Sequence, residues 1–455
     1  MTSMAIIKRK VIKTKKASEA VSTEFVLTRE DVEARSQRLD DPEWYAQARL
    51  EAWETYQRIP MPTLQDEAWR RTDIRALDWA ALQKKSLAGA AGSTNGKVPD
   101  QLLKPLVGEA HGGQLVFHNG ETASHSLDEQ LKAQGVIFTD FRTATHEYAD
   151  LLKQYLGAAV KVDDGKFSAL AATMVQEGVF VYIPANTHVE LPLHTVLWAN
   201  QSVHFSRTVI VADEGASLTY VHELSSKEND QAALHVGTVE VFVATDADVK
   251  FIELQSLGQN FWHFSHERAQ IGEDARFDWI FSAIGTHLTK NFSELNLVGD
   301  NAWGRMSGFY FAENDQHFDH DTQQNHRAFN TTSDLLFKGA LRDKSRSVWR
   351  GMIYVAPGAQ KTDGYQANRN LVLDKGARAD SIPGLEILAD DVRCTHASTV
   401  GQLEAEHIFY LMSRGLPYEE AKKLVVDGFF DPIMQRIPFE GVRTRMKETI
   451  IQKMG

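Results

Sequence analysis

The chain has 455 residues, with 49 basic and 61 acidic side chains, a net charge of −12, and a single cysteine. The negative balance argues against wholesale binding to nucleic acid or to an anionic membrane. One cysteine excludes an internal disulfide framework, and it excludes a zinc or iron–sulfur site built from this chain's thiolates alone. The apolar fraction of 43% is sufficient for a sizeable folded core.

Two segments have an amino-acid composition typical of unstructured, solvent-exposed chain. The N-terminus, MTSMAIIKRKVIKTKK, carries six Lys and Arg residues before the first acid, Glu19, and lacks the apolar centre of a secretory signal. No apolar run is long enough to span a bilayer. We therefore expect a disordered basic tail over residues 1–27 and a cytoplasmic protein. The small, Gly-rich stretch Ser86–Pro99 indicates a loop or linker.

Residues 28–165 are expected to form an N-terminal region of helices and short mixed elements. Trp44–Ile59 has apolar residues at helical spacing, with a proline just before it and two prolines after it. Gln114–His118 has the pattern of a strand leading into a tight turn at Asn119-Gly120. Thr145–Leu156 is predicted to be a helix that ends at the following glycine.

Residues 166–395 change to the period-2 pattern of short strands. Between many of the strands lies a similar turn, in which an acidic residue shortly precedes a small alanine. Four of these alanines lie 31, 28 and 27 residues apart: Ala216, Ala247, Ala275 and Ala302. A loose period of this length without intervening helices favours a β-solenoid. A β-sandwich or barrel with similar turns is the alternative. The predicted strands are Val179–Ile183, Thr208–Val211, Leu218–His222, Val239–Val243, Val249–Leu254, Phe277–Phe281 and Leu371–Leu373, and the segment Asp374–Asp380 is grouped with the turns.

Residues 396–455 return to helical spacing. Gln402–Arg414 is predicted to be a helix closed by Gly415. A second helix begins at Pro417 and has Gly428 near its end, and Glu440–Lys453 is expected to form a third.

The candidate chemistry begins with a histidine-rich stretch. On a strand, His317, Asp319 and Asp321 would share one face, and His320 and His326 would point the other way. We therefore expect hydrogen-bonded polar side chains here rather than a metal site. A metal-dependent enzyme using the three histidines, and a carbohydrate-active enzyme using the two aspartates as acid and base, are the alternatives. The sequence lacks a phosphate-binding loop, so the chain is not expected to hydrolyse ATP.

The only cysteine lies two residues before a histidine. On an extended segment, Cys394 and His396 would project to the same side, which is a geometry suited to a soft metal or to a nucleophile. Two ligands make only half of a tetrahedral site, so another chain or a bound cluster would have to complete it. A small buried hydrophobic residue is the simpler interpretation of Cys394.

The long run Ala340–Gly415, which contains ADDVRCTHASTVGQL, resembles the SufB/SufD family of the SUF iron–sulfur cluster assembly system. Further matching segments are Tyr56–Asp73, Leu115–Gly120 and Gly178–His194, so the resemblance covers most of the chain beyond about residue 40. It is closest to SufD, since SufB is expected to carry several thiols. One departure is Ala397, where the family pattern has glycine.

The resemblance implies a mainly β protein, a right-handed parallel β-helix core flanked by helical regions. It implies a non-catalytic scaffold subunit that pairs with SufB through the β-helix and docks the SufC ATPase through its C-terminal helices. His396 would be a transient iron ligand at a cluster-assembly interface, with Cys394 beside it. We expect no tightly bound cofactor in the lone chain, a transient iron–sulfur cluster at the interface, and no nucleic-acid or membrane partner. The resemblance leaves open whether a flavin binds in the complex and whether the lone chain forms a homodimer. The residues that we expect to contact SufC are Tyr410, Arg414, Gly415 and Tyr418.

Overall fold

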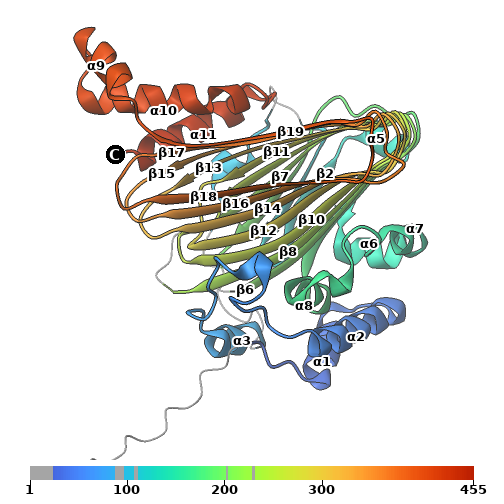
Figure 1. Ribbon diagram of the computed structural model, residues 1–455. Helices are drawn as coiled ribbons and strands as arrows, with labels where there is room; N and C mark the ends of the chain where they lie inside the picture. Colours follow the sequence, from blue (N-terminus) through green and yellow to red (C-terminus); the bar gives the residue numbers. More distant parts are fainter. Residues whose placement is uncertain (1–23, 88–96, 107–110, 201–202, 228–230) are drawn as a thin grey trace, which may run out of the picture.

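The computed structural model describes residues 24–87, 97–106, 111–200, 203–227 and 231–455 (Figure 1). Most of the expected basic tail and the middle of the expected Gly-rich linker lie outside these ranges. In the described part of the chain, none of the helices combines the length and the apolar character needed to cross a membrane.

The centre of the molecule is a parallel β-solenoid of about eight coils (Figure 1). Each coil contributes one strand to each of two sheets, which we call the even sheet (β4 to β18) and the odd sheet (β5 to β19). The solenoid is therefore a flattened tube, and the predicted fold class is confirmed. Its strands are β4 (Glu177–Ile183), β5 (Leu193–Ala199), β6 (Val203–Ala212), β7 (Ser217–Ser226), β8 (Ala233–Val243), β9 (Asp248–Ser256), β10 (Phe261–Ile271), β11 (Arg276–Ala283), β12 (Leu288–Leu297), β13 (Trp303–Ala312), β14 (His317–His326), β15 (Thr332–Leu341), β16 (Arg346–Val355), β17 (Asp363–Val372), β18 (Arg378–Ile387) and β19 (Arg393–Gln402).

The repeated turns lie along one edge of the solenoid and connect even strands to odd strands. In each turn the residue before the alanine has positive φ, as at Asp246 (58°) and Asp274 (55°), which aspartate tolerates better than most residues. The N–H of Asp246 donates to the carbonyl oxygen of Glu273, one coil further on, at 2.9 Å. These bonds hold successive turns in register, and the alanines that follow are buried in one column.

The regular alanine spacing ends after Ala302 because threonines occupy the alanine position in the next two turns. Thr331 and Thr362 occupy the next two turns, and their hydroxyls lie 3.3 Å apart. The segment around Gly376 connects β17 to β18, so it belongs to the opposite edge of the solenoid from the other predicted turns.

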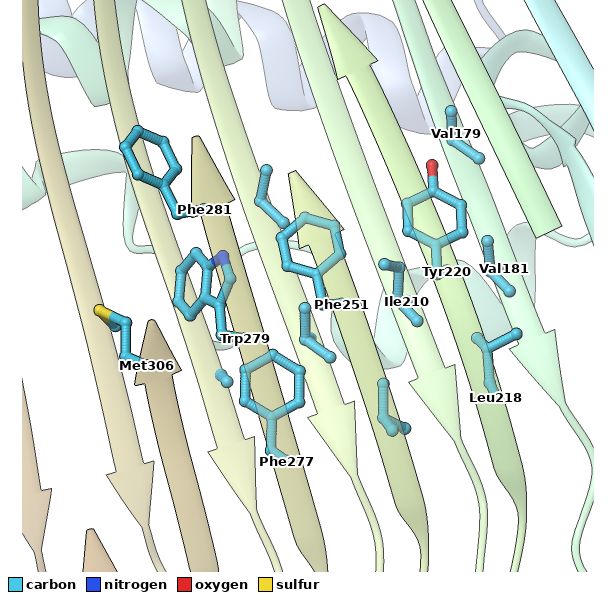
Figure 2. Close-up of a cluster of buried hydrophobic side chains, with 14 of the residues drawn as sticks. Val179, Val181, Ile210, Leu218, Tyr220, Phe251, Phe277, Trp279, Phe281 and Met306 are labelled. Carbon is cyan, nitrogen blue, oxygen red and sulfur yellow. The ribbon is translucent and has the colours of Figure 1, made fainter. Parts of the chain in front are cut away.

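The space between the two sheets is filled mainly by apolar side chains over the first coils (Figure 2). Tyr220, Phe251 and Trp279 lie in register on neighbouring odd strands, with ring centroids 5.8 and 5.6 Å apart. Val181 and Ile210 extend the same core from the even sheet. Burial of such large side chains is worth about 2–3 kcal/mol each and is the main term that stabilises the stack.

The N-terminal region covers the outer face of the even sheet and extends the first coil. The predicted turn at Asn119-Gly120 joins β1 to β2, and both residues have positive φ. The predicted helix Thr145–Leu156 is interrupted at Tyr148, whose φ of −123° and ψ of 28° break it into α6 and α7. The elements are α1 (Arg29–Leu39), α2 (Glu43–Arg58), η1 (Glu67–Trp69), α3 (Trp79–Leu87), α4 (Asp100–Leu103), β1 (Gly113–His118), β2 (Glu121–Leu127), α5 (Glu129–Ala133), β3 (Ile137–Asp140), α6 (Phe141–Glu147), α7 (Ala149–Tyr155), η2 (Val162–Asp164) and α8 (Lys166–Met174).

Of the three C-terminal helices, α10 and α11 lie on the opposite side of the solenoid, against the odd sheet, and α9 projects away from it (Figure 1). They are α9 (Ala405–Ser413), α10 (Tyr418–Met434) and α11 (Glu440–Lys453). Gly415, with φ of 96°, separates α9 from α10 as predicted, whereas α10 continues through Gly428 to Met434. The last strand, β19, extends to Gln402, beyond the predicted end of the β region at residue 395.

Candidate functional site

The strand that carries Cys394 and His396 is the last strand of the odd sheet. In the described structure, β19 pairs with β17 alone, and β18 pairs with β16 alone. The final coil therefore leaves a free strand edge on both sheets. Outward-pointing N–H and C=O groups on such an edge are a template for a strand from another chain.

Cys394 and His396 project from the same face of β19 because they are two residues apart on an extended strand. Cys394 is in register with Gly364, and His396 with Gln366, on the neighbouring strand β17. Cys394 is half-buried against an apolar cluster that contains Ile353, whereas the His396 side chain is exposed. The histidine is thus accessible to a ligand, and the thiol is partly packed.

The surroundings of Cys394 favour the protonated thiol. Burial raises its pKa, and the charge of Asp363 adds to the rise, while the backbone N–H of Gly364 acts in the opposite sense. The thiol is therefore not a preformed thiolate in the lone chain. Ala397 lies within the extended part of β19, so this position does not need the conformational freedom of glycine.

Apolar side chains surround the free edge. Leu385, Ile387, Leu388 and Val400 are 37%, 38%, 51% and 48% exposed, although they are aliphatic. Clustered exposed apolar residues beside an open strand edge are typical of a protein–protein contact. The sequence prediction missed this surface because β18 (RADSIPGLEI) contains Pro and Gly and was not recognised as a strand.

The four residues predicted to contact SufC lie where α9 meets α10. Tyr410 and Tyr418 are exposed, and the Arg414 guanidinium lies 5.3 Å from the centre of the Tyr410 ring. Phe409, which is 72% exposed, was not predicted as part of this surface, nor were Met412 and Leu424. The signal was available, because α9 (AEHIFYLMS) is apolar on nearly all sides, and such a helix needs a partner to cover it.

The histidine-rich strand β14 has a different role. His317 lies 2.9 Å from the Thr72 hydroxyl, and His326 lies 2.7 Å from Thr331. The His320 ring is enclosed by aromatic rings, and its nitrogens have no hydrogen-bond partner in the described residues. The described residues contain no group of three or more His, Cys, Asp or Glu side chains that could hold a metal ion. Asp319 is buried and paired with Lys290, which weighs against an acid/base pair open to a sugar.

The comparisons with known proteins agree on the class of protein that these features define. Residues 195–429 match the family model described as SUF system FeS cluster assembly, SufBD core domain. Residues 33–195 match the model for the SufBD protein N-terminal region. The chain belongs to the SufBD family of iron–sulfur cluster assembly proteins.

Individual relatives support the same assignment over nearly the whole chain. The iron-sulfur cluster assembly protein SufD of Bacillus subtilis is 30% identical over 439 residues, which cover 95% of this chain and 99% of the relative. A SufBD family protein of Staphylococcus saprophyticus is 30% identical over 91% of this chain and 90% of its own length. One from Staphylococcus aureus strain USA300 is 28% identical with the same coverage.

Proposed function

We propose that this chain is the SufD-like, non-catalytic scaffold subunit of a cytoplasmic SUF complex. It pairs with SufB through the open end of the solenoid and docks the SufC ATPase through α9 and α10. The observation that carries the proposal is the free edge of the last coil, with the Cys394–His396 pair on its terminal strand. The lone chain offers half of a site there, and a partner edge supplies the rest.

The proposed pairing with SufB at the open end combines main-chain hydrogen bonds with the burial of apolar side chains. A partner strand added to β19 or β18 satisfies the free edge groups with main-chain hydrogen bonds. The same step covers Leu388 and Val400, which water now contacts. A related solenoid with an equivalent open end would satisfy both requirements at once.

His396 is the proposed ligand for iron, which enters the interface as a substrate together with sulfide. Its exposed imidazole can donate a nitrogen lone pair, which iron accepts. The Cys394 thiol ligates only after it loses its proton, which its burial opposes in the lone chain. Cys394 therefore assists the site or packs beside it, and the remaining ligands come from SufB.

The C-terminal helices provide the link to ATP hydrolysis. Phe409, Tyr410 and Tyr418 form the proposed SufC contact. From there, α10 reaches the odd sheet, where Phe430 and Phe309 have ring centroids 5.9 Å apart. In the proposed mechanism, closure of two ATP-bound SufC subunits pulls on the helical ends of SufB and SufD. That motion opens their shared interface and exposes His396 to iron and sulfur.

The test is co-expression of the chain with SufB and SufC, followed by purification and quantification of bound iron and sulfide. Replacing His396 by Ala is expected to remove most of both while the complex still forms. His188→Ala is the control, because this exposed histidine lies in the β4–β5 connection, far from the open end along the solenoid. Undiminished iron and sulfide in the His396→Ala complex would contradict the ligand role.

A further inference from the structure

The strand that carries the candidate site leads directly into the helix of the proposed SufC contact. β19 ends at Gln402 and α9 begins at Ala405, so only two residues lie between them. His396 is therefore joined to Phe409 by a short stretch of continuous chain, whereas the other route runs along α10 into the apolar cluster on the odd sheet. A displacement of α9 acts first on the C-terminal end of β19.

The C-terminal half of β19 is held mainly by its backbone. Within the described chain, none of the residues of β19 is buried, whereas most residues of β15 are. The side chains of Ser398, Thr399 and Val400 are exposed, and the strand pairs with β17 alone. A segment with few buried apolar contacts and solvent-exposed backbone hydrogen bonds is the kind that opens locally while the rest of a protein stays folded.

The N-terminal end of β19 is attached more firmly. Cys394 packs against the apolar cluster that contains Ile353. The N–H of Arg393 donates to the carbonyl oxygen of Thr362 at 2.8 Å, just before β17 begins. The strand therefore has an anchored end and a lightly held end, and His396 lies between them.

The three C-terminal helices differ in how they are fixed. Two ion pairs tie α11 to the solenoid, Arg445 with Glu223 at 2.8 Å and Lys453 with Glu313 at 2.5 Å, and α10 shares the apolar cluster of the odd sheet. Among the described residues of α9, only Ile408 is buried, and the helix projects away from the solenoid (Figure 1). A force applied by a bound partner therefore moves α9 more readily than α10 or α11.

We propose that α9 pulls β19 away from β17, and that this separation within the chain regulates the access of iron and sulfide to His396. The inference rests on the proposed function, because it assigns the regulation of the same site. ATP-driven movement of SufC displaces α9, and the hydrogen bonds between β19 and β17 then break in order from Gln402 toward His396. The end at Cys394 stays attached, so the strand pairs with β17 again when SufC returns.

The first test is hydrogen exchange of the natural chain in its complex with SufB and SufC, with and without the ATP analogue AMP-PNP. The amides of residues 397–402 are expected to exchange roughly fivefold faster or more with the analogue, because their bonds to β17 open. The amides of β15 should exchange at the same rate in both states. Equal exchange of residues 397–402 in both states would overturn the proposal, and this arm needs no variant.

The second test inserts six flexible Gly and Ser residues between Leu403 and Glu404, which adds about 13 Å of slack between strand and helix. SufC should still bind, since Phe409 is unchanged, but the exchange of β19 should no longer respond to AMP-PNP, and bound iron and sulfide should fall several-fold. The control is the same insertion after Gly358, in an exposed turn with open space around it. A full response and normal iron in the first variant would overturn the proposal. Failure of the natural chain to bind SufC would instead contradict the proposed function.

Discussion

The ammonium group of Lys290 lies 3.0 Å from a carboxylate oxygen of Asp319, and neither side chain is more than 3% exposed. Lys290 is on β12 and Asp319 is on the next even strand, β14. The hydroxyl of Thr72, from the N-terminal region, donates to the other oxygen of Asp319. This buried pair therefore holds an N-terminal segment against the outside of the solenoid.

Replacing Lys290 by Met is expected to destabilise the fold by about 3–5 kcal/mol, because Asp319 would remain buried without its cation. Urea unfolding followed by circular dichroism measures the change in free energy. Lys375→Met, at an exposed position, is the control and should change the free energy by no more than about 0.5 kcal/mol. A loss below about 1 kcal/mol in Lys290→Met would show that the pair contributes little.

Asp321 makes stability depend on pH. Burial raises its pKa from 3.8 to about 6, although Lys290 and Arg350 oppose the rise. Between these two values the unfolded chain ionises while the folded carboxyl keeps its proton, so the free energy of unfolding falls as pH increases. The fall attributable to this group is about 3 kcal/mol and is complete above about pH 6. In Asp321→Asn this contribution is absent.

The measurement for Asp321 is the free energy of unfolding of the natural chain minus that of Asp321→Asn, from pH 4 to pH 7. Taking the difference cancels the contributions of the buried histidines. The natural chain should lose its relative advantage as pH increases through this range. A difference that stays constant would contradict the raised pKa.

Gly285 is expected to tolerate no side chain. A Cβ there would lie 1.9 Å from the carbonyl oxygen of Leu257, in the backbone of the adjacent coil. Gly285→Ala should therefore lower the free energy of unfolding by about 1–3 kcal/mol or more, because the coils must move apart. Gly358→Ala is the matched control, since a Cβ at Gly358 would meet nothing within 4 Å. Similar urea midpoints for the two variants would contradict the close approach.

A charged substitution on the free edge should prevent SufB binding without destabilising the chain itself. Val400→Lys places a cation on β19, so we expect it to abolish co-purification with SufB while the chain alone keeps its unfolding temperature. Val298→Lys is the control, because Val298 is 46% exposed, close to the 48% of Val400, but lies in an earlier turn. Normal SufB recovery with Val400→Lys would contradict pairing through this edge.

The contact with the ATPase should depend on the large exposed side chain on α9. Phe409→Ser is expected to reduce SufC binding by roughly 30-fold, as an aromatic residue at the centre of an interface commonly does. Ile451→Ser, on the exposed side of α11, is the control. Calorimetric titration with SufC gives both affinities, and equal values would place the SufC contact elsewhere.

The sequence predicted the solenoid best where its turns are chemically uniform. Ala247 and Ala275 recur because the column inside the turn edge has room for a methyl group, and the pattern failed where Thr331 forms a hydrogen bond instead. The β18 strand was missed because it contains a proline, which sheets accept mainly on an edge strand, and a glycine, which weakens the strand pattern.

Part of the candidate site could likewise be predicted from the sequence, and part of it could not. The spacing of two between Cys394 and His396 places them on one face of any extended segment, so this geometry was predictable. Local pattern does not encode which strand lies at the end of a sheet, because that depends on which other segments pair with it in three dimensions. The break at Tyr148 was likewise invisible, since its helical neighbours on both sides have favourable spacing.

The position of α11 has a consequence for synthesis. Its residues Met446 and Ile450 share one apolar cluster with Val221 and Ile252 of the early strands β7 and β9. As the chain leaves the ribosome, coils can stack in order, but Val221 and Ile252 lack the cover of Met446 and Ile450 until the last helix emerges. The free edge of the last coil and the cover for the early coils are therefore both completed by the C-terminal part of the chain. A chain released early would leave these apolar side chains of the early strands exposed to solvent and to proteases.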